Sequence, residues 1–136
     1  MSIRNLEFLF RPKSIAVIGA SDRVGSVGAT VMRNVTAGGF SGPIYAVNPA
    51  HLAVGGQRAY PEVTHLPQTP DLAVIATPPA TLPALIDALG QRGTRAAIVL
   101  TGGLGRARDA NGNTILQAMR DAARPHLLRI LGPNCV

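Results

Sequence analysis

The chain has 136 residues, of which 46% are hydrophobic and 15% charged, a composition that supports one domain with one buried core and excludes two independent domains or extensive disorder. The net charge of +6 suits an anionic partner, but the thirteen basic residues are scattered and aromatic residues make up only 4%, so we expect no nucleic-acid ligand. No apolar run reaches the ~18 residues of a membrane span, and a single cysteine excludes an intrachain disulfide and a thiolate zinc site, so a soluble, cytoplasmic protein is expected.

Strand and helix patterns alternate along the chain. Five short apolar runs, most of them rich in β-branched residues, occupy residues 14–20, 43–48, 71–77, 96–101 and 127–131. Such runs are typical of strands that are buried on both faces of a parallel sheet. Apolar residues at helical spacing predict helices at 26–35, 81–91 and 113–124. The stretch 50–70 contains three prolines and two glycines, and we expect a loop there with at most one helical turn near residues 62–65.

This order predicts an α/β protein built on a doubly wound sheet of about five parallel strands. Ligands of such sheets bind beyond the carboxyl ends of the strands, where the strand order reverses. The loops that reach this edge are 20–28, 48–51, 77–79, 101–105 and 133–135. The chain ends five residues after the fifth strand without a closing helix, so we expect residues 1–136 to be the first domain of a longer polypeptide.

The loop that follows the first strand is a candidate phosphate-binding site. Residues 19–28 connect a strand to a helix, where backbone amides and the positive helix end attract an anion, and Arg23 adds a cation. The spacing departs from the dinucleotide fingerprint, because Ser21 and Val24 stand where G-x-G-x-x-G requires glycine. A purely structural tight turn is the alternative interpretation.

The second strand ends at Asn48, where a nicotinamide-dinucleotide site usually offers an acidic residue to the ribose hydroxyls. The missing carboxylate suits a ligand that carries phosphate in this region, because like charges would repel. The absence of a carboxylate at this position is also compatible with NADP, which carries a phosphate on its ribose. An Asn before Pro49 is equally the sequence of an ordinary Asx turn, and both interpretations stay open.

Short motifs of modest individual specificity run along essentially the whole chain. They are LFRPKSIAVIGAS at 9–21, GSVG at 25–28, VNP at 47–49, AYP at 59–61, ATPP at 76–79 and GPNC at 132–135. In this order and spacing the chain resembles the coenzyme A-binding domain at the N-terminus of nucleoside-diphosphate-forming acyl-CoA synthetases, which is related to the succinyl-CoA synthetase alpha subunit. Members of that family are also found fused to GNAT-type protein acetyltransferases.

The resemblance implies a Rossmann-like fold and a coenzyme A site formed by the loops above. The CoA phosphates would lie on the first loop, the adenosine near residues 48–51 and the pantetheine arm along residues 101–103. The residues implied to bind CoA are Gly19, Ala20, Ser21, Arg23, Val24, Gly25, Ser26, Val27, Gly28, Asn48, Pro49, His51, Thr77, Pro78, Pro79, Thr101, Gly102, Gly103 and Asn134. No catalytic residue and no metal ligand is expected in this chain, and ATP, ADP and magnesium would belong to the full-length parent.

The sequence departs from the family pattern at two places. Family members often carry a lysine after Asn-Pro that suits a CoA phosphate, whereas Ala50 and His51 follow here, which leaves His51 or Arg58 as candidate substitutes. After the fourth strand, Thr-Gly-Gly-Leu and then Arg106 replace a Ser-Ala-Gly-Phe run followed by an acidic residue. Cys135 has no base next to it in the sequence, and we do not expect it to act as a nucleophile.

The leading hypothesis is the CoA-binding domain of an acyl-CoA synthetase, with an ADP-forming acetate-CoA ligase as the type of parent. In the parent, CoA would attack an acyl phosphate formed by downstream domains or a partner subunit, while the isolated domain would bind CoA without turnover. One alternative is a CoA- or acyl-CoA-sensing domain of a fused protein lysine acetyltransferase. Another is an NADP-binding reductase domain, which the broken fingerprint and the lack of a Tyr-Lys or Cys-His arrangement disfavour.

Overall fold

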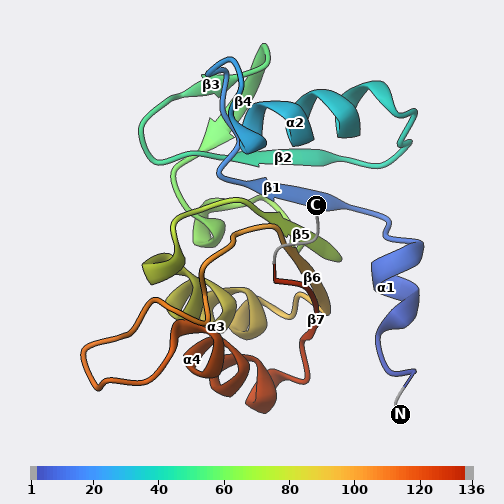
Figure 1. Cartoon of the computed structure of the whole chain (residues 1–136). Coiled ribbons are helices and arrows are strands. Elements are labelled where there is room, and N and C mark those ends of the chain that lie inside the picture. The colour runs from blue at the N-terminus through green and yellow to red at the C-terminus, as the bar shows by residue number, and fades with distance from the viewer. Residues whose placement is uncertain (1–2, 134–136) are drawn as a thin grey trace.

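A computed structural model describes residues 3–133, and a single sheet of seven strands runs through it in the order β3-β4-β2-β1-β5-β6-β7 (Figure 1). The five expected strands are present and pair in parallel. They are β1 (Ile15–Ile18), β2 (Ile44–Val47), β5 (Leu72–Ile75), β6 (Ala96–Val99) and β7 (Arg129–Leu131). All four residues of β1 and of β5 are buried, which accounts for their continuous apolar sequences.

Helices cover both faces of the sheet. On one face lies α2 (Val27–Ala37), and on the other lie α3 (Leu82–Arg92) and α4 (Ile115–Ala123) (Figure 1). Two separate apolar clusters fill the space between the helices and the sheet, because successive residues of each strand point to opposite faces. The predicted α/β, Rossmann-like class is confirmed, and none of the described helices is long and apolar enough to cross a membrane.

The prediction of a loop over residues 50–70 is wrong for its first part. The chain there forms a hairpin of β3 (Ala53–Val54) and β4 (Gln57–Tyr60), whose strands pair antiparallel, and β4 then pairs parallel with β2. Gly55 and Gly56 connect the two strands with φ of 59° and 76°. Positive φ at both central residues is the geometry of the tight hairpin turn that matches strand twist. The expected helical turn is present as η1 (Val63–His65).

Three further short elements complete the chain. The helix α1 (Leu6–Phe10), which the sequence pattern did not indicate, packs near β6. The single turns η2 (Pro79–Thr81) and η3 (Arg124–His126) precede α3 and follow α4, respectively. Because β1 pairs with β2 on one side and with β5 on the other, the connections leaving β1 and β5 diverge to opposite faces. In sheets of this kind, the crevice that binds ligands lies at the carboxyl ends of two such strands.

A hydrogen bond between His126 and Asp87 fastens η3 to α3. His126 Nε2 lies 2.8 Å from Asp87 Oδ1, and the imidazole packs so closely on Gly90 that a Cβ there would lie 2.3 Å from the ring. The hydrogen bond with His126 lowers the pKa of Asp87 below its ordinary value, and a hydrogen bond from Gln91 lowers it further. Partial loss of solvation raises this pKa, but its effect is smaller than that of the His126 hydrogen bond.

We expect Asp87→Asn to weaken the acid sensitivity of the fold. A carboxylate whose pKa is lowered in the folded state contributes stability above its unfolded value of about 3.8, and that contribution is lost as the pH falls through the lowered value. Urea denaturation in steps from pH 7 to pH 3 should therefore show a larger loss of unfolding free energy for the natural chain than for Asp87→Asn below about pH 4. Parallel pH profiles for the two proteins would contradict this assignment.

Candidate functional site

Internal hydrogen bonds hold the loop between β1 and α2 in one shape. The Arg23 amide donates to Ser21 Oγ at 2.9 Å, and the Ser26 hydroxyl donates to the Arg23 carbonyl at 2.8 Å. Ser26 is the N-cap of α2, because its Oγ accepts from the Ala29 amide at 3.1 Å. The other amides of the first turn have no acceptor within the helix. They face the carboxyl edge of the sheet as potential donors to an anion.

Two glycines bring the start of α2 onto the end of β1. A Cβ on Gly28 would lie 1.9 Å from the Gly19 carbonyl oxygen, and one on Gly19, whose φ is +91°, would lie 2.5 Å from the Ala76 carbonyl oxygen. These approaches leave room for hydrogen only. Gly28 thus provides the close helix-to-strand packing for which the dinucleotide fingerprint uses its third glycine. Counted from Gly19, the fingerprint spacing places this glycine at Val24, so the loop in this chain is longer by four residues.

The side chain of Asn48 joins the ends of β1 and β2. Its Nδ2 donates to the Ala20 carbonyl at 2.9 Å, and its Oδ1 accepts from the amides of Ala50 and His51 at 2.7 and 3.2 Å. The Asx turn considered in the sequence analysis is therefore formed. The same side chain also braces the base of the loop of residues 19–28, which we name the phosphate loop after its expected ligand. The local sequence did not indicate this contact.

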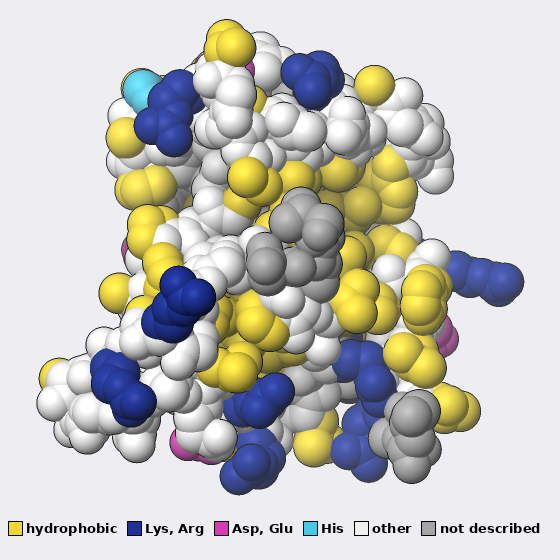
Figure 2. Space-filling model, in the orientation of Figure 1, with side chains coloured by type: hydrophobic (Ala, Val, Ile, Leu, Met, Phe, Trp, Pro, Cys, Tyr) yellow, Lys and Arg dark blue, Asp and Glu magenta, His cyan; other side chains and the backbone are white. Residues whose placement is uncertain are grey.

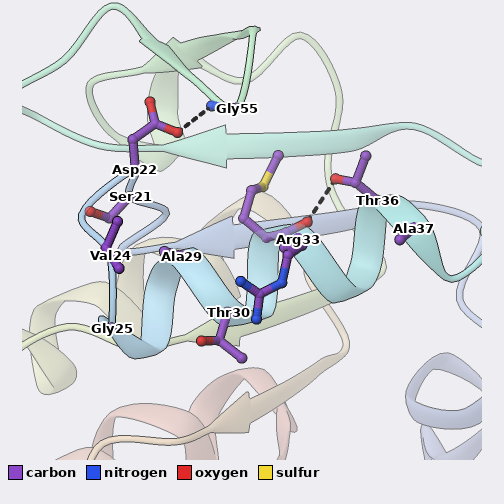
Figure 3. A pocket seen from close by; sticks show the side chains of 11 residues that line it. Ser21, Asp22, Val24, Gly25, Ala29, Thr30, Arg33, Thr36, Ala37 and Gly55 are labelled. Carbon is purple, nitrogen blue, oxygen red and sulfur yellow. Dashed lines mark hydrogen bonds between the residues drawn. The ribbon is translucent and has the colours of Figure 1, made fainter.

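Asp22 ties the phosphate loop to the β3–β4 hairpin, and sequence reasoning missed this residue. Its Oδ1 accepts from the Gly55 amide at 2.8 Å. Figure 3 shows this contact beside the residues that line a hollow between the phosphate loop, α2 and the hairpin. The hollow has a volume of about 430 Å³, and Thr30 and Arg33 of α2 lie on its wall. The partners are 33 residues apart, so only knowledge of the hairpin would have revealed the contact.

A second hollow, of about 480 Å³, lies at the carboxyl edge on the face covered by α3. Gly19, Pro49 and Thr77, all implied by the resemblance, line it together with residues that the sequence analysis did not single out. The added residues are Ile18, Val47, Pro61, Glu62, Val63, Thr64, Thr81, Ala84, Leu85 and Ala88. The pairing of β4 with β2 brings residues 61–64 to this edge, and the mostly apolar wall suits a flat aromatic group.

Thr77 separates the second hollow from a smaller one of about 170 Å³ that is lined by Val27, Leu100, Thr101 and Gly102 as well as Thr77. The Thr101 hydroxyl donates to the Thr77 carbonyl at 2.6 Å and joins the ends of β6 and β5. The Thr81 hydroxyl lies 2.7 Å from that of Thr77 and donates to the Pro78 carbonyl at 2.6 Å. The 77–81 turn is therefore rigid and forms a partition between the two hollows.

Two basic residues, Arg58 and His51, lie within three residues of the lining of the second hollow. The Arg58 guanidinium stands over the ring of Tyr60, 5.1 Å from its centroid, and Tyr60 packs edge-to-face on Tyr45. Both tyrosines pack against the apolar cluster under α3, so Arg58 is on the same face of the sheet as the second hollow. His51 ends the turn that leads into β3, the strand paired with β4. Arg58 and His51 are both exposed.

The structure brings most of the implied residues to the same edge, at strand ends or in the first turn of α2. They are Gly19, Ala20, Ser21, Gly25, Ser26, Val27, Gly28, Asn48, Pro49, Thr77, Pro78, Pro79, Thr101 and Gly102. Arg23, Val24, His51 and Gly103 belong to the same loops and are exposed. Asn134 and Cys135 lie outside the described residues. Over residues 3–133, no group of three or more His, Cys, Asp or Glu side chains is placed to hold a metal ion.

Known proteins similar to this chain share one domain type. The family model described as "CoA binding domain" matches residues 13–136. The chain is 36% identical over 131 residues to acetate–CoA ligase (ADP-forming) I of Archaeoglobus fulgidus, covering 96% of this chain and 19% of that protein. It is 36% identical over 134 residues to the alpha subunit of acetate–CoA ligase (ADP-forming) I of Pyrococcus furiosus, covering 96% of this chain and 29% of the subunit.

A solved structure gives the same picture. The apo form of the dinucleotide forming acetyl-coenzyme A synthetase 1 of Ca. Korarchaeum cryptofilum superposes with a TM-score of 0.84 at 34% identity, over 95% of this chain and 28% of that one. The chain thus spans less than a third of the length of each of these three relatives.

Proposed function

The chain belongs to the CoA binding domain family, and from this premise we propose that it is the CoA-binding module of an ADP-forming acyl-CoA ligase. The observation that carries the proposal is the packing of Gly28 on Gly19, which directs the first turn of α2 at the crevice between β1 and β5. Coenzyme A fits this arrangement, because its pyrophosphate requires amide donors, its adenine an apolar surface and its 3′-phosphate a cation. The relatives are CoA ligases by name, and they favour neither the reductase nor the acetyltransferase alternative.

In the proposed arrangement, the nucleotide half of CoA lies across the ends of β1 and β2. The pyrophosphate accepts hydrogen bonds from the amides at the start of α2 that have no acceptor within the helix, with Arg23 as a counter-charge. The adenine enters the hollow of about 480 Å³ between Val47, Pro61 and Leu85. The ribose then lies over Gly19 and Asn48, where a glycine allows close approach to the backbone.

The 3′-phosphate follows from the position of the ribose. The 3′-phosphate projects from the ribose toward the 48–51 turn, near which the Arg58 guanidinium supplies a positive charge and the His51 imidazole a hydrogen-bond donor. Stacking on Tyr60 preorients the Arg58 guanidinium, and a guanidinium binds phosphate through two parallel hydrogen bonds. We assign this phosphate to Arg58, with His51 in support.

The pantetheine half crosses the Thr77–Thr101 partition into the smaller hollow beside Val27 and Gly102. Pro78 and Pro79 flank the crossing point, and Gly103 lies farther along the path toward the thiol. In the parent ligase, the CoA sulfur attacks an acyl phosphate, so that the carbon–sulfur bond forms, the carbon–oxygen bond to phosphate breaks, and the thiol proton passes to solvent. Further domains or a partner subunit of this cytoplasmic enzyme bind ATP and magnesium and form the acyl phosphate.

Isothermal titration of the isolated chain tests the proposal. We expect CoA to bind at one site, NADPH to bind at least about tenfold more weakly, and acetyl phosphate plus CoA to give no turnover. Circular dichroism under the same conditions would establish that the sample is folded. Preference for NADPH, or no heat from CoA with a folded chain, would overturn the assignment.

A further inference from the structure

A groove runs along the free edge of the sheet, away from the proposed CoA site. Two adjoining hollows, of about 310 and 370 Å³, share Ala123, Arg124, Leu128 and Ile130 and therefore form one groove between α4 and β7, which we name the β7 groove. Its floor is apolar, since Ala123 and Leu128 are each 6% exposed and Met119 is 1% exposed. A floor of this kind can bury the side chains of an extended segment.

The backbone of β7 is able to accept another strand. β7 is the last strand of the sheet and pairs only with β6 within residues 3–133. The Arg129 amide donates toward β6, to the Arg95 carbonyl at 3.0 Å. Backbone groups of successive residues in a parallel strand point to opposite sides, so the N–H and C=O of Ile130 point outward. These groups are the usual template for strand addition.

The rim of the groove is strongly basic. Arg120 and Arg124 extend from α4, while Arg4 and Arg129 lie at the amino end of β7. Figure 2 shows basic side chains gathered at the end of the molecule that contains α4 and β7. Asp121 lies 3.9 Å from Arg124, and both side chains are more than half exposed, so this pair neutralises little of the positive field.

We propose that the β7 groove binds an acidic, extended segment of a partner polypeptide, which adds a strand to β7 and places its carboxylates against Arg120 and Arg124. The charge of the rim selects the occupant. A second copy of this chain would bring the same arginines face to face, because a two-fold contact at this edge pairs each rim with itself, and the like charges would repel. The proposal stands on the groove and the sheet edge and does not depend on the CoA assignment.

Fluorescence anisotropy with a labelled peptide of alternating glutamate and valine tests the proposal on the intact chain. We expect this peptide to bind, and the same peptide with lysine in place of glutamate not to bind. Replacing each valine by proline should abolish binding while the charge is kept, because proline removes the backbone donors. Bound peptide should also slow hydrogen exchange at the Ile130 amide.

The double variant Arg120→Glu/Arg124→Glu should weaken peptide binding at least about tenfold, because two charge-assisted contacts become repulsive. The matched control is Arg11→Glu/Arg106→Glu, which makes the same charge change at two exposed residues elsewhere and should reduce affinity less than about twofold. Equal losses of peptide affinity in the two double variants would show that binding depends only on the net charge of the chain, and would overturn the proposal. Tighter binding of a single-stranded oligonucleotide of equal charge would reassign the groove to nucleic acid.

Discussion

Gly28→Ala is expected to destabilise this domain by about 3 kcal/mol or more and to lower its melting temperature by about 10 °C. The new Cβ would lie 1.9 Å from the Gly19 carbonyl oxygen. The Cβ is fixed to the backbone of α2, and the oxygen belongs to the backbone of Gly19, whose amide is bonded to the Val47 carbonyl, so no side chain can rotate out of the way. Either α2 must move away from the sheet or the end of β1 must distort, and both movements displace the amides proposed to bind the pyrophosphate. CoA affinity in a titration should therefore fall at least about tenfold even where the variant is still folded.

Gly105→Ala is the matched control for this change. It makes the same substitution in an exposed loop, with no other heavy atom within 4 Å of the new Cβ, and should alter stability by less than about 0.5 kcal/mol. Thermal and urea denaturation of both variants, followed by CoA titration, gives the comparison. Unchanged melting and CoA binding in Gly28→Ala would mean that the helix does not pack on the strand as the structure shows.

The central part of the fold could be predicted from the sequence because its strands are buried on both faces. Burial on both faces requires continuous apolar runs such as 15–18 and 72–75, and these runs are visible without any structure. The β3–β4 hairpin lacks such a signal, since β3 has two residues and one of them is exposed. Its Gly55-Gly56 turn was the available clue. The helix α1 has five residues and gains support from tertiary contacts, including Arg95 over the Phe8 ring at 5.9 Å.

The candidate site could be predicted to the level of loops but not of contacts. Parallel topology alone brings the turns after β1, β2, β5 and β6 to one edge, which is why the loop residues were identified. The roles of Asp22 and of Pro61 depend on the hairpin and on β4, and neither was foreseen. Asn48 was considered as a ligand or as a turn residue, whereas the structure shows that one amide can form the turn and also brace the phosphate loop.

Asn48→Asp should weaken CoA binding at least about tenfold. The carboxylate can still accept from the amides of Ala50 and His51, so the turn is kept, but it cannot donate to the Ala20 carbonyl 2.9 Å away. Two oxygens without a hydrogen between them repel, and the loss of this hydrogen bond costs about 1–3 kcal/mol. The added negative charge also faces the phosphates of the nucleotide in the proposed arrangement. Calorimetric titration with CoA and urea denaturation measure the two effects separately.

Two further variants distinguish the effect of the added negative charge from the effect of losing the Asn48 hydrogen bonds. Asn34→Asp adds the same charge on the exposed surface of α2 and should leave CoA affinity within about twofold. Asn48→Ala removes all three hydrogen bonds without adding charge, so it should destabilise the fold at least as much as Asn48→Asp but weaken CoA binding less. Equal losses of affinity in the two Asn48 variants would show that the residue acts by bracing the loop alone. Unchanged affinity in Asn48→Asp would place the CoA phosphates away from the β2 end, and the proposed orientation of the nucleotide would have to be abandoned.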